Sequence, residues 1–173
     1  MNTAQLQTFC TEVRRDIINM TANAGSGHPG GSLSAVELMS AIFCTQMRID
    51  PKNPKDPDRD RFVLSKGHAA PCYYGILAEL GFFSQDEFKT FRQLHGMLQG
   101  HPDMKKIPGV DASTGSLGQG ISLAVGMALG AKHMGKDTRV YTILGDGECQ
   151  EGQVWEAFMA ASHYKLDNLT VVI

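Results

Sequence analysis

The sequence predicts an α/β fold in which a parallel sheet carries helices on both faces. Three β-rich apolar segments, 62–65, 140–144 and 169–173, are separated by helical patterns. The last two segments are joined by a helical pattern at 153–164, and strand, helix, strand at this spacing is a βαβ unit with parallel strands and a right-handed crossover. With 173 residues, the chain suits one domain that buries a core.

Composition and charge exclude several classes of protein. Hydrophobic residues make up 42% and charged residues 20%, as in ordinary soluble proteins. A net charge of −2 gives no electrostatic case for binding nucleic acid or an anionic membrane. No apolar run approaches the roughly 20 residues of a membrane span, and the N-terminus does not resemble a signal peptide. Four widely spaced cysteines without a Cys-x-x-Cys pair indicate reduced thiols in a cytoplasmic protein.

The first third of the chain predicts two helices around a glycine-rich loop. An apolar stripe predicts a helix over 3–22, and the Gly/Pro cluster at 23–31 ends it. The capping-box pattern Ser34-x-x-Glu37 predicts the start of a helix over 35–47. His28 therefore lies on a loop before a helix. Taken alone it indicates a surface turn, although a rigid loop between helices is also where ligand-binding residues lie.

The middle of the chain predicts a solvated loop at 50–61, a buried strand at 62–65 and a helix over 72–80. His68 follows Gly67 directly after the strand. A second capping box, Ser84-x-x-Glu87, predicts a helix of about two turns. His101 lies in the turn 98–102, before an exposed loop at 103–110.

A glycine-rich stretch, 113–120, leads into an apolar helix predicted over 121–133. Its glycines do not fit the dinucleotide-binding pattern, no strand precedes them, and the lysine of a P-loop is missing. By itself this stretch is also consistent with a helix entry chosen for close packing.

Gly145-Asp146-Gly147 follows the strand at 140–144, and ligands of parallel α/β sheets bind beyond the carboxyl ends of strands. A bare carboxylate there would repel a phosphate, and a divalent cation, Mg²⁺ or Ca²⁺, removes that conflict. The simpler interpretation is a turn with an Asx-type hydrogen bond. The chain stops at a predicted buried strand, so we expect residues 1–173 to be a single domain that is incomplete at its C-terminus.

Five phrases occur in a fixed order: Ser26-Gly-His-Pro-Gly, Leu64-Ser-Lys-Gly-His, Gly100-His-Pro, Thr114-Gly-x-Leu-Gly-Gln-Gly and Gly145-Asp-Gly. With them, essentially the whole chain resembles the N-terminal, thiamine diphosphate-binding part of transketolase, and most of all the separate N-terminal subunit of a split transketolase. The resemblance implies a thiamine diphosphate-binding fold, here truncated. It also implies transfer of a two-carbon ketol unit from a ketose phosphate to an aldose phosphate.

The resemblance also implies roles for individual residues. Asp146 would ligate the Mg²⁺ or Ca²⁺, and Gly147 would donate its backbone N–H to the diphosphate. His68 would bind the diphosphate, and His28 and His101 would line the path to the reacting carbon of the cofactor.

A second set of residues would meet the cofactor elsewhere. Gly115, Leu117 and Gly118 would contact its middle, and Glu151 would join the two cofactor sites of a dimer. In this interpretation the catalytic residues are His28, His68, His101 and Glu151. For Glu151 the simpler interpretation is a carboxylate favoured by the helix dipole.

Other parts of such an enzyme are expected outside the chain. The resemblance implies a second metal ligand, an Asn, beyond Ile173, because Asn168 comes too early and at the wrong end of the sheet. A partner chain would supply the pyrimidine-binding domain and the catalytic glutamate, in a dimer or heterotetramer that acts on sugar phosphates. We therefore expect the chain alone to be inactive and to expose an apolar surface.

Three alternatives remain open at this point. Gly-Asp-Gly alone does not exclude another thiamine diphosphate enzyme, such as a 2-oxoacid dehydrogenase subunit or a deoxyxylulose phosphate synthase. A non-catalytic module that keeps the cofactor fold is a second alternative. A zinc site built from the three histidines is disfavoured, because they show no short ligand spacing and no paired cysteine.

Overall fold

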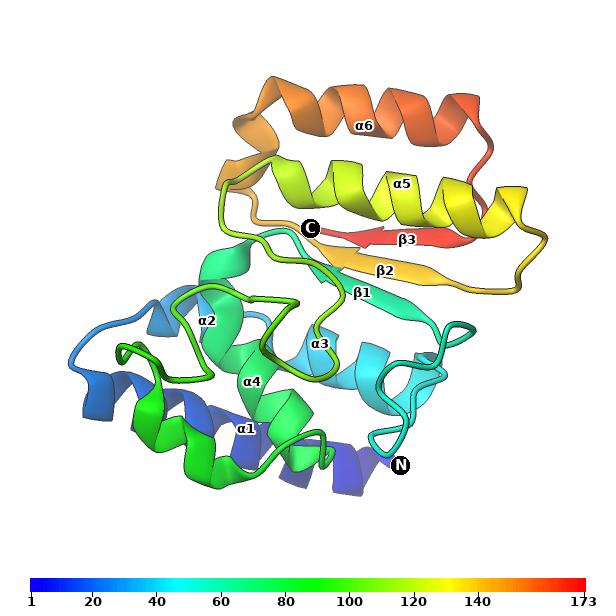
Figure 1. Ribbon diagram of the computed structural model, residues 1–173. Coiled ribbons are helices and arrows are strands. Elements are labelled where there is room, and N and C mark those ends of the chain that lie inside the picture. The colour runs from blue at the N-terminus through cyan, green and yellow to red at the C-terminus, as the bar shows by residue number, and fades with distance from the viewer.

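The computed structural model describes residues 1–173 and has three layers, with a parallel sheet between two sets of helices (Figure 1). The sheet contains β1 (Arg61–Leu64), β2 (Val140–Ile143) and β3 (Leu169–Val172) in the order β1-β2-β3. Both strand pairs are parallel, with Arg61 opposite Val140 and Val140 opposite Leu169. The predicted fold class and the βαβ unit are therefore confirmed.

One face of the sheet is covered by α1 (Thr3–Ala24), α3 (Val36–Ala41) and α4 (Ala70–Glu79), over a core of 26 buried residues. Helix α1 forms because its apolar stripe, which includes Val13 and Ile17, is fully buried in that core. Asn2 and Gln5 close its N-terminus with reciprocal side-chain bonds. Gly25 ends it at a φ of 60°, which glycine adopts without strain.

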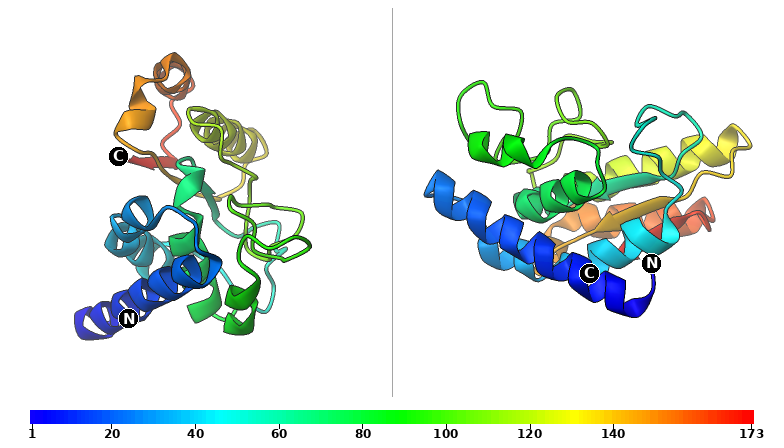
Figure 2. Two further views of the ribbon diagram at one scale, coloured as in Figure 1. Left: turned by 90° about the vertical axis from the view of Figure 1, so that its left-hand side faces the viewer. Right: turned by 90° about the horizontal axis from the view of Figure 1, so that it is seen from below.

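The other face is covered by α5 (Gln119–His133) and α6 (Gly152–His163), which lie side by side above the sheet (Figures 1 and 2). A second core of 11 buried residues fills this layer. Ala124 and Ala128 of α5 are fully buried, so the helix packs close to the strands. Helices on both faces were predicted and are confirmed.

The prediction for residues 23–47 was wrong in two respects. A five-residue helix, α2 (Pro29–Leu33), forms inside the Gly/Pro cluster, because Pro29 suits the first turn of a helix. Ser34 does not cap α3: it keeps helical backbone angles, and its hydroxyl donates to the carbonyl of Gly31. Glu37 instead pairs with Arg14, and α3 continues as a π-helix, η1 (Ile42–Gln46).

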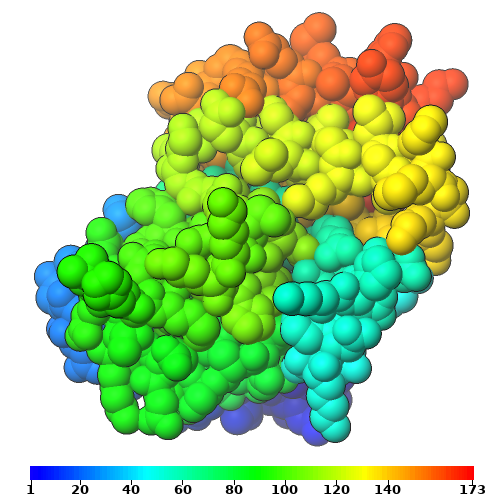
Figure 3. Space-filling view, viewed as in Figure 1, coloured from blue at the N-terminus to red at the C-terminus, as the bar shows by residue number.

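At the second capping box, Ser84 accepts a hydrogen bond from the N–H of Asp86 at 3.2 Å, but the helix it opens is a 3₁₀-helix, η3 (Gln85–Thr90). Two further 3₁₀ turns, η2 (Gly67–Ala69) and η4 (Gly147–Gln150), follow β1 and β2. Residues 92–118 contain no helix or strand and cross the front of the molecule, where they form a continuous surface (Figure 3).

The last strand differs from its prediction as a buried strand. β3 is one edge of the sheet and, unlike β1 at the other edge, it is not fully covered: Leu169 and Val171 are only partly buried and Thr170 is exposed. None of the helices combines the length and the apolar character that crossing a bilayer requires.

Candidate functional site

The candidate site lies at the carboxyl edge of the sheet, toward which all strands of the parallel sheet point (Figure 1). Turn η2 leaves β1 there and carries His68, and η4 leaves β2 there after Asp146. The loop that carries His28 and the N-terminus of α5 reach the same edge. Ligands of such sheets bind in this position.

The structure brings the three predicted histidines together from segments far apart in the sequence. The ring centroid of His28 lies 5.4 Å from that of His68 and 6.3 Å from that of His101. His28 and His101 are exposed and His68 is half-buried. The three imidazoles therefore form one group that a ligand from solvent can reach.

Close glycine contacts position these histidines. A Cβ on Gly31 would lie 2.9 Å from Nε2 of His68, and a Cβ on Gly115 would lie 2.9 Å from Cδ2 of His101. Gly115 also has a φ of 147°, which side chains rarely adopt. A Cβ on Gly67 would lie 2.6 Å from the backbone nitrogen of Gly115. The glycine-rich stretch therefore packs directly against the turn that carries His68.

The same stretch continues toward Glu151. Gly118 is the N-cap of α5 with a φ of 81°, and a Cβ there would lie 2.9 Å from Cβ of Glu151. Glu151 is exposed, and it is the N-cap of α6 rather than a residue of its first turn. Its side chain makes no capping bond, so its carboxylate is free. Leu117 is 38% exposed and presents an apolar side chain at the same edge.

Asp146 is the predicted metal ligand of the site. It is exposed at the carboxyl end of β2 and is the N-cap of η4, with no side-chain capping bond. The Asx-type turn offered as the simpler interpretation is therefore wrong. Gly147 opens η4, is exposed, and has no atom within 4 Å of the position a Cβ would take. An oxygen donor without a partner, beside open space and backbone N–H groups, fits Mg²⁺ or Ca²⁺ shared with a phosphate.

The chain does not build a complete metal site from its own side chains. No group of three or more His, Cys, Asp or Glu residues is arranged to hold a metal ion. His28, His68 and His101 therefore do not form such a group. Asp146 would therefore share a hard cation with ligands from outside these residues.

The electrostatics of the site favour neutral imidazoles. Burial, followed by the charges of His28 and Lys66, lowers the pKa of His68 below its usual range. Burial, followed by His28 and Arg92, lowers the pKa of His101. Both rings are therefore neutral at pH 7, and each has one nitrogen that donates a hydrogen bond and one that accepts.

Sequence analysis missed Glu148, which is only 2% exposed. Its carboxylate accepts from Ser65 Oγ at 2.5 Å and from the N–H groups of Gly118 and Gly145, each at 2.9 Å. It therefore joins the end of β1, the entry of α5 and the turn after β2. The available signal was an acidic residue beside glycine-rich turns, whose N–H groups need an acceptor.

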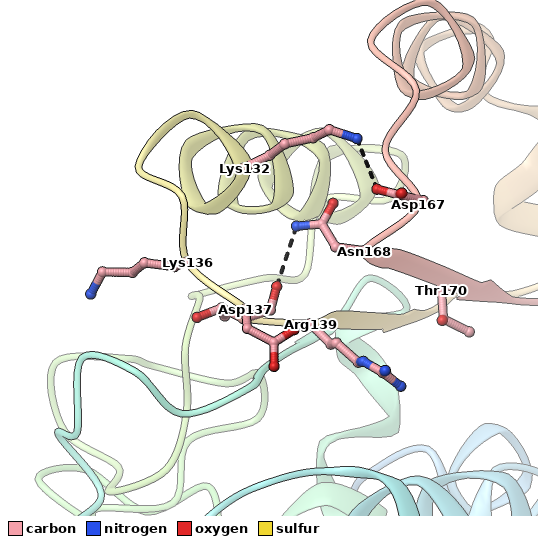
Figure 4. A pocket seen from close by; sticks show the side chains of 8 residues that line it. Lys132, Lys136, Asp137, Arg139, Asp167, Asn168 and Thr170 are labelled. Atoms are coloured by element: carbon pink, nitrogen blue, oxygen red, sulfur yellow. Dashed lines mark hydrogen bonds and ion pairs between the residues drawn. The ribbon is translucent and has the colours of Figure 1, made fainter.

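The opposite edge of the sheet holds a polar pocket of about 410 Å³ (Figure 4). Asn168 lies there and donates to the carbonyls of Ala128 and Thr138, away from Asp146 as expected. Lys132 pairs with Asp167 at 2.8 Å. The charges of this pocket are largely neutralised within the chain, so the candidate site remains at the carboxyl edge.

Comparison with known proteins gives a consistent result. The family model described as "Transketolase, thiamine diphosphate binding domain" matches residues 7–173. A human protein named transketolase is 47% identical over 169 residues, which are 97% of this chain and 27% of the human one. One subunit of the apulose-4-phosphate transketolase of Actinobacillus succinogenes is 41% identical over 97% of this chain and 61% of its own length.

Solved structures agree with the sequence relatives. A transketolase mutant from Pichia stipitis superposes with a TM-score of 0.94 at 37% identity, and covers 98% of this chain and 26% of its own. Transketolase from Leishmania mexicana superposes with a TM-score of 0.93 at 32% identity, and covers 96% and 26%. The chain thus spans about a quarter of the full-length relatives.

Proposed function

The chain belongs to the transketolase family as a thiamine diphosphate-binding domain, and from this membership we propose that it serves an enzyme that transfers a two-carbon ketol unit from a ketose phosphate to an aldose phosphate. The observation that carries the proposal is the exposed, partner-free carboxylate of Asp146 at the end of β2, beside three clustered histidines. Because the chain spans only 27% of the human relative, the activity belongs to a larger assembly.

In this proposal the turn η4 and the residues beside it would hold the diphosphate end of the cofactor. Asp146 ligates Mg²⁺ or Ca²⁺, and the N–H of Gly147 donates to the diphosphate. His68, half-buried and held against Gly31, donates a further hydrogen bond to it. The second protein ligand of the cation comes from outside residues 1–173.

The remaining site residues meet the cofactor and the sugar. Gly115, Leu117 and Gly118 would contact the middle of the cofactor, and the absence of a side chain at the two glycines lets His101 and Glu151 lie close beside them. Thiamine diphosphate, when bound, supplies the ring that stabilises a carbanion. His28 and His101 bind the sugar hydroxyls and move protons at the reacting end, a role that suits imidazole because its nitrogens can donate or accept hydrogen bonds.

A partner chain completes the enzyme in this proposal. It supplies the pyrimidine-binding domain and the catalytic glutamate, and Glu151 links the two cofactor sites of the resulting dimer or heterotetramer. Two observations support a partner. One relative is named as one subunit of a larger enzyme. In addition, Trp155 and Met159, one turn apart on α6, are 60% and 73% exposed.

We place this enzyme in the cytoplasm, because its four cysteines are free thiols. The relatives reported above are transketolases, which favours ketol transfer over 2-oxoacid decarboxylation or deoxyxylulose phosphate synthesis. The presence of a free Asp146 and three histidines at one edge also favours an active site over a non-catalytic module.

The test is an activity assay of the full protein assembled with its partner, in the presence of thiamine diphosphate and Mg²⁺. We expect transfer of a two-carbon unit between a ketose phosphate and an aldose phosphate, and no oxidative decarboxylation of a 2-oxoacid. The chain of residues 1–173 alone should be inactive. Activity of the isolated chain, or decarboxylation without ketol transfer by the assembly, would contradict the proposal.

A further inference from the structure

Lys66 is unusual among the buried charges of this chain. It is 9% exposed, whereas the other buried ionic side chains each have charged or multiple polar partners. Arg59 pairs with Asp111 at 2.6 Å, and Asp60 pairs with Arg48 at 2.9 Å. The ammonium of Lys66 forms no ion pair, and its only side-chain hydrogen bond is a 3.3 Å contact with Ser34 Oγ.

The position of Lys66 explains where its missing partner would lie. It follows β1 at the carboxyl edge, two residues before His68. Its Cβ and Cδ both lie 3.8 Å from the position that a Cβ on Gly145 would occupy, so the side chain runs beside the residue that precedes Asp146. Its ammonium then reaches Ser34, directly after the helix α2 whose Gly31 contacts His68.

No carboxylate of the chain forms an ion pair with this ammonium. Glu148 packs beside Lys66, since its Cβ lies 3.7 Å from the same position next to Gly145, but its oxygens accept from Ser65, Gly118 and Gly145. A charge held in a largely buried side chain without a counter-ion disfavours the folded state. The fold therefore maintains an uncompensated positive charge at the edge where a phosphorylated ligand would bind.

We propose that Lys66 is the built-in counter-ion for the diphosphate group of the cofactor, held beside His68 before the cofactor arrives. This inference rests on the proposed function and deepens it. Asp146 acts on the diphosphate through a cation, whereas Lys66 acts on it directly. An ammonium fixed by burial loses little freedom on binding, so its contribution appears as affinity for the phosphates.

The experiment measures binding and apo stability of the full protein in its assembly, for the wild type, Lys66→Met, Lys66→Arg and the control Lys55→Met. Lys55 is an exposed lysine without an ion pair in the loop before β1. Titration calorimetry with Mg²⁺ uses thiamine diphosphate and, separately, inorganic diphosphate as probes. Thermal unfolding is recorded without ligand and with thiamine diphosphate.

We expect Lys66→Met to weaken binding of both probes about ten- to hundred-fold, the loss of one charge-assisted hydrogen bond. In the absence of ligand the same variant should unfold at the wild-type temperature or higher, because an uncompensated buried charge has been replaced by an apolar side chain of similar shape. Lys66→Arg should recover part of the affinity, and Lys55→Met should change neither quantity.

The outcomes separate the two proposals. If the wild type does not bind thiamine diphosphate, the proposed function and this inference both fail. If the wild type binds and Lys66→Met binds equally well, only the role of Lys66 is overturned. A purely structural role would show a lower unfolding temperature without ligand and an unchanged affinity of the folded variant, and that result also overturns the inference.

Discussion

Removal of the Glu148 carboxylate should destabilise the protein and loosen the contacts between the three segments that it joins: the end of β1, the entry of α5 and the turn after β2. In Glu148→Ala, three donors around this buried position lose their acceptor: the hydroxyl of Ser65 and the N–H groups of Gly118 and Gly145. Each unsatisfied donor costs about 1–3 kcal/mol. Contributions that share one carboxylate are not additive. We therefore expect a destabilisation of about 4 kcal/mol or more.

Glu148→Gln gives a graded result from the same geometry. Oε1 accepts from both Ser65 and Gly118, and Oε2 accepts from Gly145. A glutamine oxygen in the place of Oε1 keeps two of these bonds, and its NH₂ group then faces the N–H of Gly145. One donor is left without an acceptor, so the expected loss is about 1–3 kcal/mol.

Amide hydrogen exchange of the full protein is the direct assay, because two of the three donors are backbone amides. Protection at Gly118 and Gly145 should fall in Glu148→Gln and fall further in Glu148→Ala. The matched control is Glu156→Gln, a carboxylate exposed on α6, which should stay within about 0.5 kcal/mol of the wild type. Unchanged protection in Glu148→Ala would refute the assignment of Glu148 as the link between these segments.

Three further predictions follow from packing and titration. Gly120→Ala places a Cβ 2.5 Å from Cα of Ser65 and should destabilise the protein by about 1–3 kcal/mol in denaturant unfolding. The control Gly130→Ala, which has open space around its Cβ position, should stabilise the protein by about 0.5–1 kcal/mol. Equal effects of the two substitutions would contradict this prediction. Burial, followed by the charge of Glu79, raises the pKa of the Asp16 carboxyl from 3.8 to about 7. Between these two values the folded state holds a proton that the unfolded state releases, so the stability of the fold decreases as the pH rises. Asp16→Asn should remove that decline between about pH 4 and about pH 7, and an unchanged slope in this window would count against it. Asp111→Asn should lower the free energy of unfolding by about 3–5 kcal/mol in thermal or denaturant unfolding, because Arg59, at 2.6 Å, loses its buried counter-ion. A decrease of less than about 1 kcal/mol would show that the fold does not need this ion pair.

Strong periodicity made the fold predictable. The apolar stripe of α1 and the apolar runs of the strands are local signals, and each was located within a few residues of its observed bounds. Parallel pairing followed from the length of the crossover helix. The partial exposure of β3 was not predictable in the same way, because its apolar composition does not reveal how far the rest of the chain covers it, and β1 at the other edge is buried.

The capping boxes show why local motifs were less reliable. Ser84 adopts the extended angles that an N-cap needs and accepts from Asp86, whereas Ser34 follows α2 directly and stays helical. The same four-residue pattern therefore forms an N-cap at Ser84 but not at Ser34. The conformation of the preceding residues decides between them, and the pattern does not contain it.

The site residues were predictable as separate motifs, but their contacts were not. His28, His68 and His101 were selected because each follows a glycine, and the structure adds that their rings lie together. Glu148 and Lys66 escaped selection because burial gives them their importance, and a charged residue in a turn is normally exposed. Their roles depend on three segments that meet only in the folded chain.

The most direct test of the account is titration calorimetry of the full protein, in its assembly, with thiamine diphosphate and Mg²⁺. Binding should be saturable, should require the cation and should be lost in Asp146→Ala. The control Asp137→Ala, which removes an exposed carboxylate from the opposite edge of the sheet, should bind as the wild type does. Metal-dependent binding that survives in Asp146→Ala, or no binding by the wild type, would contradict the central claim that Asp146 anchors the cofactor at this edge.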